Sequence, residues 1–275
     1  MYVGTTSPFS GSELVKTDQL NQVHQEQQIH ANSLEQVEIK PQLSENDVKE
    51  FIFNKIKSGE AKELNECLIA LDTLQKSKHL SSSMKFETQW ARGEEEMKPL
   101  QYACFLGNIE VVKVLLEHGA SVNDFGNTSD STQRGSLHFA LDADHSDVAL
   151  LMLEKGAKDR VASCETFHAF RKYKLPTEWG GSWTCLSALH IAIIKNLPEV
   201  VNKLMIVGDG KIAVKASGSN SCLHLAARDG NEAMVKLLLS HGAKSVLGVK
   251  DQFGKTPKDV AIANKHDNLV ELLTA

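Results

Sequence analysis

One spacing recurs along the last two thirds of this 275-residue chain. Four leucines each precede a glycine by nineteen residues, and the pairs are Leu100 with Gly119, Leu137 with Gly156, Leu189 with Gly208, and Leu223 with Gly242. A spacing kept through consecutive segments is typical of repeat proteins, in which each unit buries its apolar face against its neighbours. The chain is therefore expected to form a solenoid of stacked units, and not a domain with one central core.

The repeated segments also share the residues around that spacing. KPLQYACFLGNIEVVKVLLEHGASVN at 98–123 has counterparts later in the chain, at 135–159, 187–210, 221–244 and 256–275. DQFGKTP (251–257), CLHLAARDG (222–230) and VVKVLLEHGA (111–120) resemble the signature of the ankyrin-repeat family. The resemblance covers roughly 98–275. It implies an all-α repeat solenoid, built as an ankyrin helix-turn-helix stack of five repeats with β-turn fingers between them.

Recurring positions of the repeat have physical roles. A hydroxyl residue that opens a repeat, such as Thr256, is expected to cap the first helix. The resemblance implies that the motif histidines tie each repeat to the next by hydrogen bonds to the backbone; these are His138, His190 and His224. The turn between paired helices is glycine in two repeats, but Asp144, Asn196 or Lys265 in the others. Asn and Asp tolerate the left-handed conformation that such a turn needs, whereas lysine does so less well.

Two segments lie ahead of the recognisable repeats. Residues 1–42 are polar and are expected to be a disordered tail, because they cannot bury enough surface to offset the entropy of ordering. Residues 43–97 begin with two amphipathic runs hinged at Ser58-Gly59, which predict a helical N-terminal capping pair that acts as a degenerate repeat. The stretch 81–98 is polar and acidic and is expected to be a connector.

An insert lengthens the finger between the second and third repeats. Repeat starts are 37, 52, 34 and 35 residues apart, so the insert lies at about 161–183. Its aromatic and cationic side chains are the candidate partner-binding residues: Phe167, Phe170, Arg171, Lys172, Tyr173, Trp179 and Trp183. Aromatic residues and arginine are enriched at interface hot spots, which favours contact with a partner. The three-residue spacing of the first aromatics equally fits a short helix face that packs on repeats two and three.

Several patterns resemble motifs of enzymes or metal sites. Asp124-Phe125-Gly126 spells the kinase metal-binding tripeptide without its companion motifs, and GVKDQFGKT (248–256) misses the phosphate-binding loop by one residue. A zinc or thiolate–imidazole spacing, C-x3-H-x16-C-x4-H, is formed by Cys164, His168, Cys185 and His190. His190 already belongs to the repeat motif, and Cys164 has no close C-x2-C partner. No catalytic residue, metal ligand or cofactor is therefore expected.

Composition disfavours several classes of partner. The net charge of −5, without a cluster of excess Lys and Arg, gives no reason to expect nucleic acid. No run of about eighteen apolar residues is long enough to span a bilayer, and the N-terminal stretch is not a secretory signal. Five scattered cysteines are typical of a reduced intracellular protein, located in the cytoplasm or in the nucleus.

The resemblance implies a non-enzymatic interaction module, an adaptor or an inhibitor, that binds a folded protein partner through its concave face and fingers and is a monomer. SALHIAIIKNLPEVVNKL (187–204) also resembles a repeat of the inhibitor-of-NF-κB group, so a regulator of a transcription factor is one alternative. An ankyrin effector of an intracellular bacterium, acting on host proteins, is another. An enzyme that uses the Cys- and His-containing insert is the remaining alternative.

Overall fold

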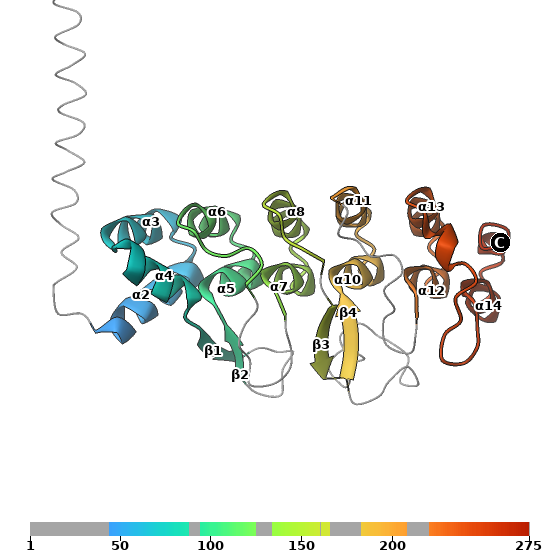
Figure 1. Cartoon of the computed structure of the whole chain (residues 1–275), viewed down its shortest axis with the longest axis horizontal. Helices are drawn as coiled ribbons and strands as arrows, with labels where there is room; N and C mark the ends of the chain where they lie inside the picture. Colours follow the sequence, from blue (N-terminus) through green and yellow to red (C-terminus); the bar gives the residue numbers. More distant parts are fainter. Residues whose placement is uncertain are drawn as a thin grey trace, which may run out of the picture. The chain divides into compact units, whose positions relative to one another are not determined.

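The computed structural model describes residues 44–87, 94–124, 134–159, 161–165, 183–207 and 220–274. The chain divides into two units, 1–47 and 48–275, and the second contains the stacked helices. These helices lie in two rows, and we call the lower row in Figure 1 the inner row and the upper row the outer row. The inner row comprises α2 (Glu45–Ser58), α5 (Pro99–Leu106), α7 (Ser136–Asp142), α10 (Ala188–Ile194), α12 (Cys222–Arg228) and α14 (Pro257–Ala263). The outer row comprises α3 (Ala61–Ala70), α6 (Ile109–Glu117), α8 (Ser146–Glu154), α11 (Pro198–Ile206) and α13 (Glu232–Ser240).

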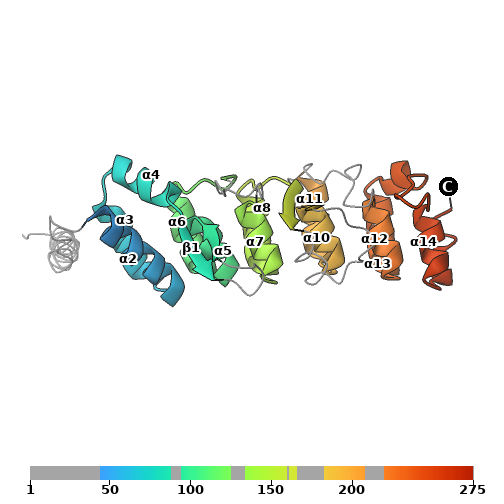
Figure 2. The same cartoon turned by 90° about the horizontal axis from the view of Figure 1, so that it is seen from below.

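Neighbouring repeats pack helix on helix. Along the inner row α5 contacts α7, α7 contacts α10, α10 contacts α12, and α12 contacts α14. Figure 2 shows these five helices side by side. Along the outer row the contacts run from α3 through α6, α8 and α11 to α13. The expected all-α repeat solenoid is therefore confirmed.

The apolar face of each outer helix closes one continuous core. In α6, Val111, Val112 and Leu115 recur at a helical spacing and are buried, because positions three and four apart share one helix face. The same buried cluster extends from Val48 to Leu273. Each repeat thus depends on its neighbours to bury its apolar side chains, as expected of a stack that has no separate core per repeat.

The residue between paired helices has a left-handed backbone in every described repeat. Gly107 and Gly230 have φ angles of 75° and 68°. Asp144, Asn196 and Lys265 follow at 67°, 53° and 64°, although a side chain is penalised in this conformation. Lys265, expected to tolerate it less well, adopts the same geometry, so the turn is set by the packing of the helix pair.

The expected connector at 81–98 is instead a helix end and a β-hairpin. A third helix, α4 (Thr73–Ser81), follows the capping pair, and β1 (Met84–Glu87) then pairs antiparallel with β2 (Glu94–Met97). Met84 lies opposite Met97, and Met97 is fully buried. The alternating MKFE pattern places apolar side chains on one face of the hairpin, which outweighs the polar composition of the stretch.

Two other elements differ from a regular ankyrin pattern. The insert begins and ends as a second hairpin, in which β3 (Val161–Glu165) pairs with β4 (Trp183–Ser187). The last two repeats contain short 3-10 helices, η3 (Ala243–Val246) and η4 (Asp267–Leu269), and η4 takes the place of a second α-helix in the fifth repeat.

Candidate interaction surface

The described parts of the segments that connect one repeat to the next extend on one side of the stack. Figure 1 shows both hairpins and the loop between η3 and α14 on this side, next to the first turns of the inner helices. Each segment ends where an inner helix begins, so the residues that cap the helix also fix the base of the finger. Ser187 and Thr256 do so by accepting the backbone N–H of the residue three positions later.

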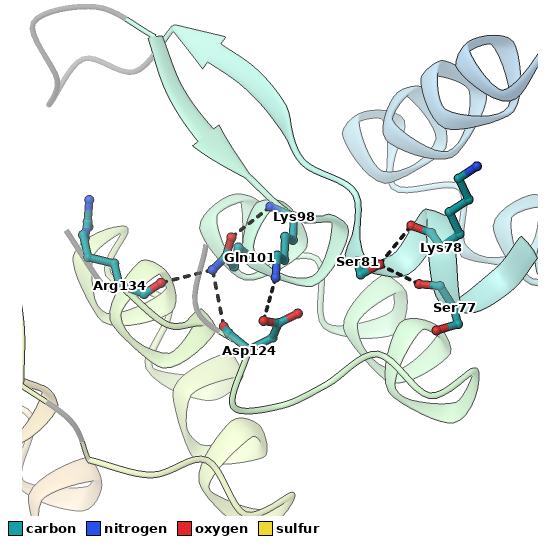
Figure 3. A network of polar contacts seen from close by, with 7 residues as sticks. All are labelled: Ser77, Lys78, Ser81, Lys98, Gln101, Asp124 and Arg134. Atoms are coloured by element: carbon teal, nitrogen blue, oxygen red, sulfur yellow. Dashed lines mark hydrogen bonds and ion pairs between the residues drawn. The ribbon is translucent and has the colours of Figure 1, made fainter. Parts of the chain in front are cut away.

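Gln101 of α5 joins the two ends of the first finger (Figure 3). Its Nε2 donates to the carbonyl of Arg134 at 3.0 Å and to that of Asp124 at 3.5 Å. Its Oε1 accepts the backbone N–H of Lys98 at 2.9 Å. Lys98 Nζ also lies 2.6 Å from a carboxylate oxygen of Asp124. Because Gln101 is only 1% exposed, its amide is shielded from water, and its bonds hold the two ends of the finger together.

Ion pairs continue this network into the second and third repeats. Arg134 is paired with the buried carboxylate of Asp142 on α7, and its guanidinium lies 4.5 Å from the centroid of the Phe139 ring. Lys195 of the third repeat is paired with Asp144 and donates to the carbonyl of Asp142 at 3.2 Å. The charged groups of Arg134, Asp142 and Lys195 are therefore satisfied within the protein, and Lys195 and Asp144 lie at the helix-pair turns, away from the fingers.

The hydrogen bonds of α4 are local. Figure 3 also shows Ser81, whose hydroxyl donates to the carbonyls of Ser77 and Lys78 at 2.8 and 3.1 Å. These bonds satisfy carbonyl groups that the end of a helix would otherwise leave free.

An aromatic cluster holds the first hairpin against the stack. The Phe86 ring on β1 is stacked on Tyr102 of α5, with centroids 3.9 Å apart and an interplanar angle of 11°. Phe53 of α2 lies 5.4 Å from Phe86 and 6.0 Å from Tyr102. Sequence reasoning missed this cluster, although the alternation in MKFE and the apolar Met97 at the end of the acidic run indicated a hairpin.

The finger between the fourth and fifth repeats, called the fourth finger below, is a tight turn closed by Asp251. One carboxylate oxygen accepts the backbone N–H groups of Phe253 and Lys255 at 2.8 and 2.9 Å. The N–H of Asp251 donates to the carbonyl of Lys255 at 2.9 Å, and Gly254 provides the left-handed residue with a φ of 76°. His224 Nε2 lies 3.0 Å from the same carbonyl, so the histidine ties repeat four to this finger as expected. GVKDQFGKT is thus a finger turn.

The candidate residues of the insert lie almost entirely outside the described residues. Phe167, Phe170, Arg171, Lys172, Tyr173 and Trp179 belong to this group. Only the backbone of Trp183 is described, at the start of β4 opposite Glu165. The hairpin brings the ends of the insert together, but local packing and partner contact both stay predictions.

The Cys and His residues of the zinc-like spacing are only partly described. Backbone pairing places Cys164 opposite Thr184 and Cys185 opposite Ser163, so the cysteines are not direct cross-strand partners. His168 lies outside the described residues. His190 Nδ1 accepts the backbone N–H of Ser187 at 3.1 Å, which commits that nitrogen to the repeat.

The buried thiols of Cys104 and Cys222 are poor nucleophiles. Cys104 and Cys222 are buried in α5 and α12, and this burial raises the pKa of the Cys104 thiol and raises that of Cys222 to about 12. Both are therefore protonated at neutral pH, whereas the thiolate is the reactive form. In the described segments no group of three or more His, Cys, Asp or Glu side chains is placed to hold a metal ion, and no helix is long and apolar enough to cross a membrane.

A family model described as ankyrin repeats in three copies matches residues 62–162 and 188–275. The first match begins inside α3, so it includes part of the capping pair.

Curated relatives share the repeats at low identity. Human palmitoyltransferase ZDHHC13 is 25% identical over 198 residues, which cover 66% of this chain and 30% of the relative. Dog inversin is 26% identical over 204 residues, 64% of this chain and 18% of inversin. A Caenorhabditis elegans homologue of transient receptor potential channel A1 is 38% identical over 76 residues, 28% of this chain and 6% of the channel. The chain thus spans less than a third of each of these proteins.

Proposed function

Because this chain belongs to the ankyrin-repeat family, a family of protein-interaction modules, we propose that it is a non-enzymatic adaptor or inhibitor that binds a folded protein through its fingers and inner helices. The observation that carries the proposal is the fixed base of the first finger, where Gln101 bonds both ends of the loop. A finger whose two ends are already fixed loses less entropy when a partner binds.

We also propose that the protein is a monomer in a reducing, intracellular compartment and that it binds neither nucleic acid nor a membrane. Cys67 and Cys104, which are buried free thiols, support a reducing compartment. The net charge of −5 disfavours a polyanionic partner. The raised pKa values of Cys104 and Cys222 argue against these two thiols as catalytic nucleophiles.

A quantitative pull-down with mass spectrometry tests the proposal. The full chain is compared with a variant in which 161–183 is shortened to an ordinary finger. The matched control is Lys236→Ala, on the outer face of α13, where Lys236 is paired with Glu232. We expect proteins that bind the wild type to be retained by the control and lost from the shortened variant, with unchanged circular dichroism in both. Equal recovery by all three chains would show that the finger at 161–183 does not bind the partner.

A further inference from the structure

The fourth finger presents one large apolar side chain to solvent. Phe253 lies at the tip of the Asp251 turn and is 53% exposed. The turn holds the residue in place, because the N–H of Phe253 and the N–H of Lys255 bond the same carboxylate. An exposed aromatic ring on a pre-organised turn is a typical anchor at a protein interface.

Two exposed lysines, Lys250 and Lys255, flank Phe253 in the sequence, and the segment around them carries an excess of positive charge. Residues 243–258 contain Lys244, Lys250, Lys255 and Lys258 against one acidic residue, Asp251, a net charge of +3. Asp251 is only 8% exposed, and its carboxylate is occupied by backbone N–H groups. Among the described residues, no carboxylate forms an ion pair with any of the four lysines.

This pattern differs from the base of the first finger. There Lys98 is paired with Asp124. Asp259 adds one anion close to the fourth finger. Its carboxylate accepts the N–H and hydroxyl of Thr256 at 2.9 and 2.7 Å, and it also interacts electrostatically with Lys250 and Lys258. With Asp259 counted, the charge of 243–259 is still +2. The exposed Lys250 and Lys255 beside an apolar anchor leave a site complementary to an acidic segment that carries an apolar residue.

We propose that the fourth finger binds a short acidic segment of the partner protein, with an apolar side chain of that segment on Phe253 and its carboxylates at Lys250 and Lys255. The inference rests on the proposed function and names the chemistry of one contact. A protein segment fits better than a lipid surface, because one aromatic side chain at a single turn gives little apolar area for insertion into a membrane.

Fluorescence anisotropy with a defined probe tests this assignment. The probe is a labelled peptide in which glutamates flank one central phenylalanine, and its matched control has glutamine at every glutamate position. We expect the full-length chain to bind the acidic peptide at least about tenfold more tightly than the glutamine peptide, and to lose affinity as salt is raised. Phe253→Ala should weaken binding by about fivefold or more.

Charge-reversal variants separate a local effect from a change in net charge. Lys250→Glu with Lys255→Glu should weaken binding about tenfold or more. Lys57→Glu with Lys62→Glu changes net charge equally at exposed positions of the capping helices and should leave binding within about twofold. Circular dichroism checks that every variant is folded.

Three results would overturn the assignment: no binding of the acidic peptide, equal binding of both peptides, or equal loss in both double variants. Binding to vesicles of phosphatidylserine and phosphatidylcholine without binding to the peptide would assign the finger to a membrane instead. Failure of the peptide together with recovery of finger-dependent proteins in the pull-down would refute this inference alone and leave the proposed function standing.

Discussion

Gln101 is expected to stabilise the first finger more than a single side-chain bond would. In Gln101→Met the volume and the unbranched shape are kept, but the N–H of Lys98 and the carbonyl of Arg134 lose partners that lie 2.9 and 3.0 Å away. A buried polar group left without a partner costs about 1–3 kcal/mol, and the longer bond to Asp124 adds little. Lys98 and Arg134 are partly exposed, so water offsets some of this cost. We expect a loss of about 2–4 kcal/mol.

Gln101→His provides the matched control, because histidine stands at this position in three other repeats. In the fourth repeat, His224 Nδ1 accepts a backbone N–H at 3.0 Å and Nε2 lies 3.0 Å from the next finger. The histidine variant should therefore lose less than about 1 kcal/mol. Urea unfolding measures both losses, and hydrogen exchange at Lys98 reports whether the finger base opens. Equal losses in the two variants, or no loss in Gln101→Met, would refute the role assigned to this amide.

Three further predictions test single contacts. A Cβ added at Gly107 would lie 2.4 Å from the His145 ring, whereas one at Gly119 would meet no atom within 4 Å. Because both positions have positive φ, Gly107→Ala should lower the free energy of unfolding by roughly 1–3 kcal/mol more than Gly119→Ala. Urea unfolding measures both losses, and equal losses would contradict the contact. The hydroxyl of Ser136 is buried without a partner in the described chain, so Ser136→Ala should raise stability by about 1 kcal/mol, and a loss would reveal a partner. Hydrogen bonds from Thr256 lower the pKa of Asp259. The contribution of Asp259 to the free energy of unfolding is therefore present above the unfolded pKa of about 4 and is lost as pH falls further. Asp259→Asn should flatten the pH dependence of the urea midpoint in this range, and an unchanged pH dependence would exclude the effect.

The repeated part of the fold was predictable because its signals are local. Leu100 and Gly119 lie within one repeat, and the capping role of Thr256 depends on residues three positions away. The hairpin at 84–97 was not predicted, because its polar composition conceals a fold that depends on contacts of Phe86 with two distant helices. The backbone of Lys265 shows the same limit, since packing set a conformation that its side chain disfavours.

The finger network was hidden for a related reason. Gln101 reaches carbonyl groups 23 and 33 residues later, and no pattern in its own segment shows those partners. The one available signal was the glutamine that stands where the resemblance places a motif histidine. The Phe253 turn was visible as DQFGKTP, but the exposure of its ring depends on how the neighbouring residues pack, which the motif does not show.

The aromatic cluster has a consequence for the smallest fragment that can be made from this protein. A fragment begun at residue 98, where the repeat motif starts, would keep Tyr102 but remove both Phe53 and Phe86. The buried tyrosine ring would then face solvent at the new end of the stack, and the shortened protein should aggregate or fray there. The shortest fragment expected to fold without aggregation must begin upstream of α2, so the capping pair and the first repeat must be kept in the same fragment.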